Sequence, residues 1–541
     1  MQLKKTGIAI AGLTSMAIAA SDKCNVVTIQ TYLPYGNVLT ADYVKNNGTY
    51  GQPSQYGDDI AFPNNATGLP DLCAVYVNAS SSDTSSFRFG LFMPDDWQEN
   101  RFLATGLGGA AGGVDWETMG YGVKNYGCAT ISSDTGHNST MSDASWAFND
   151  EEARQDWGHR ALHLSTELAK NIVNHYYDQT ISHSYYAGCS TGGRQGLRAL
   201  EMYPEDYDGV LAGAPAWYTQ RLQTSEVLLG IYNLPENATH HIPSDQFEWI
   251  FEQVLSQCDI ADGILDGIVS SPETCDFMPE KLLCGPSSNT SECLNPEQIE
   301  TLNKIHSDWK SGMNDFIFPG FNLGSESTWM LTQEADDGSY EPAGFSVNYV
   351  QDFVRNDKSW DWTTFSLDDT YLAEKLRPGN ATADDFDLRP FKQNGGKLIH
   401  YHGKADGSIP TGSSSYFYKQ VQRNLVPKGV TIDDFYRYFE IPGMNHCMGT
   451  PMNAPWFING VNQAQQLSSM PKFDAESDAF TAVIEWVENN RTVDYILATK
   501  YVSDDPAQGV EIQRPLCPYP VKAKYSGSGD VNSADSWTCD N

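Results

Sequence analysis

Three residues of the types that can together perform acyl transfer occur far apart in the chain. Ser190 is the centre of GCSTG, Asp406 lies in HGKADGSIP and His446 lies in IPGMNHC. A serine hydroxyl is a weak nucleophile near neutral pH, so it needs a base, and that base needs an orienting acid. Gly-x-Ser-x-Gly is typical of the strained strand-to-helix turn that exposes a serine nucleophile. The order Ser, Asp, His predicts a triad, although Asp406 alone could be a turn residue and His446 a solvated loop residue.

The flanking sequence predicts the elements that hold these three side chains. Apolar residues recur every three or four positions over 151–177, which predicts an amphipathic helix. Buried-strand patterns precede Asp406 and His446, and a strand, turn, helix and strand surround Ser190. Such alternation predicts a parallel sheet with helices on its faces. The predicted strands cover 87–94, 102–105, 183–188, 209–216, 397–403 and 435–442, and the helix after Ser190 covers 194–204.

The regular alternation breaks between residues 217 and 394. Clustered cysteines, acidic turns and many aromatic residues replace it. We therefore predict an α/β fold, with an α/β-hydrolase catalytic domain formed by 21–216 and 395–541. Residues 217–394 form the predicted inserted lid domain.

Backbone groups near the serine are candidates for stabilising a developing oxyanion. The N–H of Thr191 lies at the start of the predicted helix, where backbone donors have no helical partner. The glycine-rich turn TGLGGAAGG follows an early strand, so the N–H of Gly108 or Gly109 is the candidate second donor.

Cysteines stand beside two members of the predicted triad. Cys189 precedes Ser190, and Cys447 follows His446. A bond between these cysteines would staple the nucleophile loop to the base loop, with Cα atoms ~5.5 Å apart. The alternative is that each pairs elsewhere. Among other histidines, His400 and His402 alternate along a strand and are predicted to be packed structural residues, whereas His137 is a further candidate for the site.

The ends and the composition indicate an exported protein. Residues 1–20 have a basic start, an apolar run and small residues near Ala19 and Ala20, as in a secretory signal peptide. The apolar run is shorter than the ~20 residues of a transmembrane helix. The net charge of −35 argues against nucleic acid and anionic membranes as partners. Eight Asn-x-Ser/Thr sequons fit a glycosylated surface: Asn47, Asn65, Asn78, Asn138, Asn237, Asn289, Asn380 and Asn490.

Several longer stretches together resemble the tannase/feruloyl esterase family of secreted fungal hydrolases, and most closely its feruloyl esterase B group. They are PDDWQENRFLATGLGG, YYAGCSTGGRQG, EDYDGVLAGAPA, QCDIADGILDGIVSSPETC, GGKLIHYHGKADGSIP and FYRYFEIPGMNHC. The resemblance implies an α/β-hydrolase core with a large lid, the triad Ser190, Asp406 and His446, and a Cys189–Cys447 disulfide. Leu107 and the residues MGT after Cys447 depart from the family pattern. Leu107 changes nothing that a backbone donor needs, whereas MGT is expected at the rim of the site and leaves substrate preference less defined than reaction type.

The resemblance also implies a structural calcium site in the lid. It assigns carboxylates of Asp259, Asp262 and Asp266 and backbone carbonyls of Ile264 and Ile268 as ligands, and hard oxygen donors suit Ca²⁺. Without the resemblance, this loop would be interpreted as a solvated acidic turn. Eleven cysteines occur, so at least one is unpaired, and Cys128 in a buried strand is the candidate. Pairs implied by chain order and analogy are Cys258–Cys275, Cys284–Cys293, Cys24–Cys73 and Cys517–Cys539.

The function implied is a secreted carboxylic ester hydrolase that releases hydroxycinnamic acids, namely ferulic, p-coumaric or caffeic acid, from plant cell-wall polysaccharides. A tannase that cleaves galloyl esters is the nearest alternative, and gallate needs a shorter pocket with more hydroxyl contacts. A calcium-dependent binding protein on an inactive hydrolase fold is an alternative of another class, and a serine peptidase is a third. Candidate residues for an aromatic acyl pocket are Trp217, Tyr218, Trp329, Tyr349 and Phe353, although each of them taken singly is more often a core residue of the lid. The sequence does not define the oligomeric state.

Overall fold

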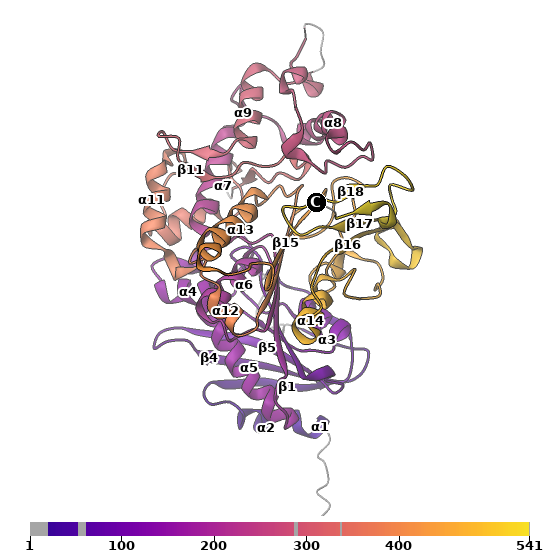
Figure 1. The fold of residues 1–541 in the computed structure, drawn as a ribbon. Helices are drawn as coiled ribbons and strands as arrows, with labels where there is room; N and C mark the ends of the chain where they lie inside the picture. The colour runs from indigo at the N-terminus through magenta and orange to yellow at the C-terminus, as the bar shows by residue number, and fades with distance from the viewer. Residues whose placement is uncertain (1–19, 52–60, 286–289, 336–337, 540–541) are drawn as a thin grey trace, which may run out of the picture.

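A nine-stranded mixed sheet passes through the centre of the computed structural model, which describes residues 20–51, 61–285, 290–335 and 338–539 (Figure 1). The strand order is β1-β4-β5-β7-β6-β8-β9-β14-β15. All pairs from β7 to β15 are parallel, whereas β1, β4, β5 and β7 pair antiparallel. The strands are β1 (Asn37–Val44), β4 (Leu72–Ser80), β5 (Ser86–Pro94), β6 (Arg101–Thr105), β7 (Ala129–Ser133), β8 (His183–Cys189), β9 (Gly209–Gly213), β14 (Lys397–Gly403) and β15 (Tyr436–Ile441).

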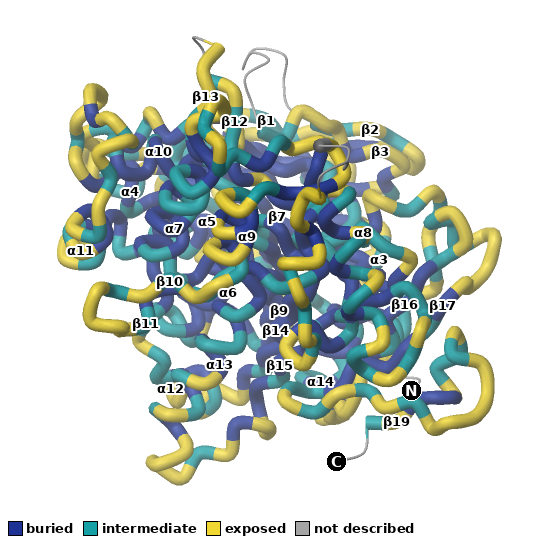
Figure 2. Tube along the Cα trace, turned by 90° about the horizontal axis from the view of Figure 1, so that it is seen from above, coloured by how far each residue is buried: buried dark blue, intermediate teal, exposed yellow. Residues whose placement is uncertain are grey.

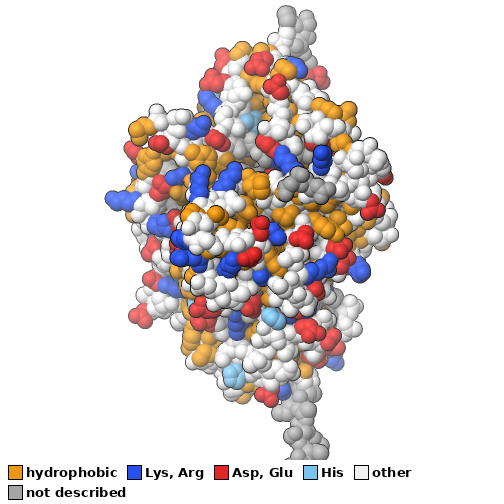
Figure 3. Space-filling model, viewed as in Figure 1, with side chains coloured by type: hydrophobic (Ala, Val, Ile, Leu, Met, Phe, Trp, Pro, Cys, Tyr) orange, Lys and Arg blue, Asp and Glu red, His pale blue; other side chains and the backbone are white. Residues whose placement is uncertain are grey.

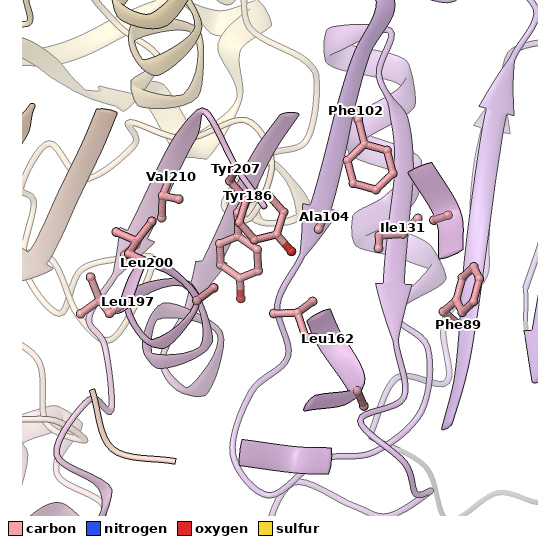
Figure 4. Close-up of a cluster of buried hydrophobic side chains, with 14 of the residues drawn as sticks. Phe89, Phe102, Ala104, Ile131, Leu162, Tyr186, Leu197, Leu200, Tyr207 and Val210 are labelled. Carbon is pink, nitrogen blue, oxygen red and sulfur yellow. The ribbon is translucent and has the colours of Figure 1, made fainter. Parts of the chain in front are cut away.

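Helices cover both faces of the parallel part, because its central strands are apolar on both sides. Every residue of β7 and β9 is buried. One face packs against α5, α6 and α13, where Tyr186, Leu197 and Leu200 meet in the core cluster of Figure 4. The other face packs against α14 and α3. These helices are α3 (Trp116–Tyr126), α5 (Ala161–Tyr177), α6 (Thr191–Met202), α13 (Gly412–Leu425) and α14 (Ala479–Asn489).

The predicted helix over 151–177 forms with one irregularity. It consists of α4 (Glu151–Gln155), a π-helical segment (Asp156–Arg160) and α5. In this segment the carbonyls of Trp157 and Gly158 accept hydrogen bonds from the buried Arg194 guanidinium, at 3.2 and 2.6 Å. The wider turn thus provides acceptors for a cation that α6 buries, a tertiary contact that the helical periodicity cannot indicate.

The chain between β9 and β14 is a long insertion between two neighbouring strands. Most of its helices lie beyond the end of the sheet that carries the carboxyl ends of the parallel strands, in the upper part of Figure 1, whereas the last helix before β14 lies lower in that view. This region has a core of its own, which includes Phe247, Val254 and Leu302. The domain boundaries at 216/217 and 394/395 stay a prediction. The helices are α7 (Thr219–Asn233), α8 (Phe247–Cys258), α9 (Pro296–His306), α10 (Ser346–Asn348), α11 (Leu367–Leu376) and α12 (Arg389–Gln393).

Short elements complete the fold around the buried centre, which is dark blue in Figure 2. Two-stranded sheets form from β2 with β3, β10 with β11, β12 with β13, β16 with β17, and β18 with β19. No helix in the described ranges is long and apolar enough to span a bilayer. The short elements are α1 (Ala20–Lys23), α2 (Val26–Gln30), β2 (Gly48–Tyr50), β3 (Ala66–Leu69), β10 (Trp309–Lys310), β11 (Phe316–Phe318), β12 (Thr332–Glu334), β13 (Tyr340–Pro342), β16 (Ile496–Tyr501), β17 (Val510–Leu516), β18 (Lys524–Tyr525) and β19 (Trp537–Thr538).

Five disulfides form, and all five predicted pairings are confirmed. Cys128 is free and buried, also as predicted. Residues 1–19 of the predicted signal peptide and the sequon at Asn289 lie outside the described residues. The pairs are Cys24–Cys73, Cys189–Cys447, Cys258–Cys275, Cys284–Cys293 and Cys517–Cys539.

Candidate active site

Ser190 occupies the sharp turn between β8 and α6. Its φ of 62° and ψ of −124° are strained for a residue with a side chain. Neighbouring segments hold the turn on both sides. The Ser190 N–H donates to the Gly213 carbonyl at 3.0 Å, and the Ser190 carbonyl accepts from Ala216 N at 3.0 Å. The end of β9 therefore fixes the serine in the geometry of a nucleophile elbow.

Glycines flank Ser190 because backbone segments approach closely there. A Cβ atom on Gly188 would lie 2.8 Å from the carbonyl carbon of Gly192. A Cβ atom on Gly192 would lie 3.0 Å from the carbonyl carbon of Gly106. Larger residues at these two positions would clash with neighbouring elements, since α6 lies directly against the glycine-rich turn after β6.

Asp406 and His446 meet at the carboxyl ends of β14 and β15. The Nδ1 atom of His446 lies 2.7 Å from Oδ2 of Asp406. The other carboxylate oxygen, Oδ1, accepts the backbone N–H groups of Ser408 and Ile409, both at 2.8 Å. Asp406 is buried, whereas the His446 side chain is 23% exposed. The carboxylate therefore has a fixed orientation toward an imidazole that substrate or water can reach.

The two groups shift each other's pKa in opposite directions. Burial alone would raise the pKa of Asp406, but the His446 charge and the hydrogen bonds from His402 and His446 outweigh it and hold the pKa well below its usual range. Burial likewise opposes the charged form of His446, but the Asp406 carboxylate raises its pKa above the ordinary value. A base with a raised pKa is protonated, and so inactive, as pH falls through that value.

A second histidine also contacts the Asp406 carboxylate. The Nε2 atom of His402 lies 3.0 Å from Oδ2 of Asp406, and its Nδ1 atom lies 2.7 Å from Oγ of Ser414. The same hydroxyl lies 2.8 Å from Nε2 of His400, whose Nδ1 lies 2.8 Å from the Tyr436 hydroxyl. His400 and His402 are fully buried, in agreement with their predicted structural packing. Their connection to Asp406 was not predicted.

The positions of the protons in this series of hydrogen bonds follow from counting donors and acceptors, beginning with the Asp406 carboxylate. An ionised carboxylate only accepts, so His402 donates through Nε2 and accepts from Ser414 at Nδ1. Ser414 then accepts from Nε2 of His400, and Nδ1 of His400 accepts the Tyr436 hydroxyl proton. Burial, followed by the neighbouring His402, holds the pKa of His400 well below its usual value. Each group is satisfied, and every hydrogen bond runs toward Asp406.

The Cys189–Cys447 disulfide joins the Ser190 loop to the His446 loop. The two Cα atoms are 5.9 Å apart, and the cysteines are 258 positions apart in sequence. Both sulfurs are nearly buried, beside Ala214 and Met448. Gln463 Nε2 donates to the Cys447 carbonyl at 2.8 Å and so supports the same loop. The predicted staple is therefore present between the residues next to the nucleophile and the base.

The candidate oxyanion donors lie on segments that pack together, and their role stays a prediction. Thr191 begins α6, and Gly109 has a φ of 54° within the glycine-rich turn. His137 contacts this turn: its Nε2 lies 3.0 Å from the Ala110 carbonyl, and its ring stacks on Trp146 at 3.7 Å. Burial lowers the pKa of His137 to about 4. His137 therefore supports the turn as a neutral donor.

Most of the aromatic residues proposed for the acyl pocket are core residues instead. Four of them are at least 94% buried within hydrophobic clusters, and Tyr218 is partly buried. The four are Trp217, Trp329, Tyr349 and Phe353. Other apolar side chains lie exposed next to the catalytic loops. Met141, 50% exposed, contacts Gly108, and Met330, 65% exposed, accepts a hydrogen bond from Ser408 at its sulfur. Sequence patterns could not separate these exposed methionines from core methionines.

The predicted calcium loop contains three neighbouring carboxylates, but they serve the loop's own backbone. Asp259 accepts the N–H groups of Asp266 and Gly267, and Asp266 pairs with Arg514 at 2.9 Å. Burial raises the pKa of Asp266, and the charges of Asp262 and Asp259 raise it further, whereas the Arg514 charge lowers it. Among the described residues, no three His, Cys, Asp or Glu side chains are gathered as a metal site. Carboxylate oxygens are donors that fit Ca²⁺.

Removal of the disulfide between Cys189 and Cys447 should slow the reaction more than it disturbs the fold. In the Cys189→Ala/Cys447→Ala variant we expect a rate of ester hydrolysis about a hundredfold lower, since ~1 Å of misplacement has that effect. Stopped-flow acylation by an activated ester measures this rate, with circular dichroism to verify folding. The control is Cys24→Ala/Cys73→Ala, which removes the disulfide between the N-terminal segment and β4. Equal rates in the folded double variant and the wild type would refute the staple.

Loss of the His402 hydrogen bond should alter the base as well as the rate. In His402→Ala the carboxylate loses a donor, so it interacts more strongly with protonated His446. We expect kcat to fall about tenfold to a hundredfold at unchanged KM, and the acid limb of the pH profile to move upward. His402→Gln, whose amide can still donate, should restore part of both effects. A lower melting temperature with an unmoved acid limb in both variants would show that His402 only supports packing.

Comparisons with known proteins agree with this geometry. A family model described as "Tannase and feruloyl esterase" matches residues 73–540. A probable feruloyl esterase B-2 from Aspergillus flavus is 33% identical over 91% of this chain and 90% of its own length. Feruloyl esterase C from Talaromyces stipitatus is 30% identical over 96% and 94%.

Solved structures support the same assignment. The crystal structure of feruloyl esterase B from Aspergillus oryzae aligns with a TM-score of 0.86 at 28% identity, and covers 96% of this chain and 100% of its own. The tannin acyl hydrolase from Aspergillus niger, at 21% identity and a TM-score of 0.74, covers 96% and 95% and shows the shared fold. The α/β-hydrolase-type fold is therefore confirmed. The chain belongs to the tannase and feruloyl esterase family and is a carboxylic ester hydrolase of the serine esterase type.

Proposed function

We propose that this enzyme hydrolyses esters between hydroxycinnamic acids and plant cell-wall polysaccharides, through an acyl-enzyme on Ser190. One observation carries the mechanism. The buried Asp406 carboxylate lies 2.7 Å from the partly exposed imidazole of His446, and a disulfide joins the His446 loop to the turn that holds Ser190. The feruloyl esterases among the relatives support the acyl group.

Acylation begins with attack of the Ser190 hydroxyl oxygen on the ester carbonyl carbon. His446 takes the hydroxyl proton at Nε2, while Asp406 accepts the hydrogen bond from Nδ1 and stabilises the imidazolium. The tetrahedral intermediate carries its negative charge on the former carbonyl oxygen. Backbone N–H groups of Thr191 and of Gly108 or Gly109 are the proposed donors to that oxygen. When the intermediate collapses, the sugar alkoxide leaves with the proton from His446.

Deacylation repeats these steps with water. His446 removes a proton from a water molecule, whose oxygen attacks the acyl carbonyl of the Ser190 ester. The second intermediate releases the cinnamic acid, and the proton returns to the serine oxygen. Both halves require a neutral imidazole at the start, so activity should fall as pH decreases through the raised pKa of His446.

The exposed methionines next to the catalytic loops support an aromatic acyl group. A thioether is flexible and polarisable, and it makes favourable contacts with aromatic rings. Met141 lies beside Gly108, which is a proposed oxyanion donor. Met330 lies beside Ser408, two positions after Asp406. Met448 follows Cys447 at the same site. The residues MGT, which depart from the family pattern, therefore lie beside the proposed site of the acyl group.

An extracellular location is part of the proposal. Five disulfides suit an oxidising compartment, and the apolar leader predicts export. None of the described sequon asparagines is buried, so each side chain is open to glycosylation. The proposed partner is a polysaccharide ester or a smaller aromatic ester.

We further propose that Ca²⁺ is a structural cofactor of the inserted region. The three carboxylates at Asp259, Asp262 and Asp266 would hold it, with carbonyl oxygens of Ile264 and Ile268. Mutual repulsion in this loop, which contributes to the raised pKa of Asp266, supports a cation there. The Cys258–Cys275 disulfide closes the same loop. The ion would reduce repulsion and fix the loop, and no catalytic step depends on it.

A substrate panel tests the acyl preference. We expect kcat/KM for methyl ferulate, methyl caffeate or methyl p-coumarate to exceed that for methyl gallate by at least tenfold, because a short galloyl group needs hydroxyl contacts in place of a propenyl spacer. Ser190→Ala should abolish labelling by a serine-directed phosphonate and reduce hydrolysis at least a thousandfold. A preference for gallate would contradict the hydroxycinnamate assignment and leave the triad unaffected. Phosphonate labelling of neither protein would favour a non-catalytic binding protein.

Calcium removal tests the structural ion. After treatment with EDTA we expect the melting temperature to fall by several degrees, because the carboxylates of the loop are left to repel one another. Added Ca²⁺ should restore it, and Mg²⁺ should do so poorly. The control variant Asp259→Asn/Asp262→Asn should melt at the same temperature with and without EDTA. An identical melting temperature of the wild type in EDTA and in excess Ca²⁺ would contradict the site.

A further inference from the structure

A large groove lies beside the catalytic loops and contains none of the proposed catalytic residues. Its volume is about 1060 Å³, which exceeds that of a typical small-molecule pocket. Its floor includes Lys404, which follows β14, and Glu440 and Pro442, at the end of β15. These are the strand ends that carry Asp406 and His446. A ligand in this groove would therefore lie close to the active site without occupying it.

Basic residues are concentrated in the groove relative to the rest of the chain. The whole sequence has 34 Lys and Arg against 69 Asp and Glu. The groove wall has five basic residues against four acidic ones, and Figure 3 shows Lys and Arg side chains across the middle of the corresponding face. The local balance of charge is therefore reversed. The basic residues are Lys404, Lys419, Arg514, Lys522 and Lys524, and the acidic residues are Asp262, Glu273, Asp308 and Glu440.

Two of these lysines remain available for a ligand. Lys404 and Lys522 already pair with Glu273. Lys419 and Lys524 are exposed, and neither forms an ion pair with a described carboxylate. Lys419 instead lies over the ring of Tyr519, 5.8 Å from its centre. An anionic group that enters the groove would meet these ammonium groups without breaking an existing ion pair.

Aromatic rings line the same walls. Tyr416, Tyr519 and Tyr525 are each partly buried, so part of each ring stays open to the groove. Trp537 lies beneath the guanidinium of Arg514 at 4.0 Å, and the Arg514 Nε and Nη1 groups have no acceptor among the described residues. Flat rings present electron-rich faces to the C–H groups of a sugar ring, whereas the cations select a negative charge. Rings and cations therefore line the same groove, and Lys419 and Arg514 each lie against one of the rings.

We infer that this groove binds a carboxylated sugar chain, with pyranose rings on the tyrosines and a uronate carboxylate at Lys419 and Lys524. The inference rests on the proposed function, since such a chain would be the polysaccharide that carries the scissile ester. A chain held here would increase the time that its ester spends near Ser190. The contact should weaken as salt screens the exposed lysines.

Isothermal titration of the full-length Ser190→Ala protein tests the groove. The probe is a xylo-oligosaccharide with a glucuronic acid branch, and the unbranched oligosaccharide is the comparison ligand. We expect the acidic oligosaccharide to bind at least fivefold more tightly. Lys419→Ala/Lys524→Ala should remove that difference, because two exposed charge contacts together account for about this factor.

A matched variant controls for the change in net charge. Lys375 and Lys472 are exposed, lie outside the groove lining and form no ion pair with a described carboxylate. Lys375→Ala/Lys472→Ala should leave binding of the acidic oligosaccharide unchanged, and all lysine variants made with Ser190 intact should hydrolyse methyl ferulate at the wild-type rate. Equal binding of both oligosaccharides, or no effect of the groove variant, would overturn the inference. If the wild-type enzyme failed to hydrolyse methyl ferulate, that result would instead contradict the proposed function, whatever the titration showed.

Discussion

The buried carboxylate of Asp406 imposes the strictest requirement on this part of the molecule. A carboxylate removed from water is stable only when its oxygens are saturated with donors. Asp406 receives the N–H groups of Ser408 and Ile409 on one oxygen and the imidazoles of His402 and His446 on the other. The turn after β14, the strand histidine and the loop after β15 must therefore all adopt their positions together.

The inserted region is attached to the catalytic loops at specific points. Thr328 donates its hydroxyl proton to the Ala405 carbonyl at 3.0 Å, and Met330 N donates to the Gly407 carbonyl at 3.4 Å. In the helix that follows Ser190, Arg194 of α6 donates to the carbonyl of Ala381. A shift of the inserted region would therefore move both the loop that carries Asp406 and the helix that follows Ser190. That coupling gives the insertion a physical route to influence catalysis as well as substrate access.

Charge is distributed unevenly over the molecule. A net charge of −35 repels polyanions at long range, yet the groove beside β14 and β15 carries a small excess of basic residues. At physiological ionic strength the general repulsion is screened within about 8 Å, so short-range contacts decide what binds there. Overall composition therefore argues more strongly against nucleic acid as a partner than against a sparsely charged polysaccharide.

The sequence by itself determined the triad candidates and the strands that carry them, and it suggested cysteine pairings without fixing their connectivity. Local signals sufficed for the elements, because a glycine-flanked serine and a buried apolar run are set by neighbouring residues. The pairings also drew on the family resemblance. Tertiary structure decided which polar residues share the Asp406 carboxylate. The sequence pattern predicts His402 only as a packed strand residue, and only the fold brings its Nε2 atom to Asp406. It also reassigned Trp217, Trp329, Tyr349 and Phe353 to cores and left Met141 and Met330 exposed, since burial depends on packing between segments remote in sequence.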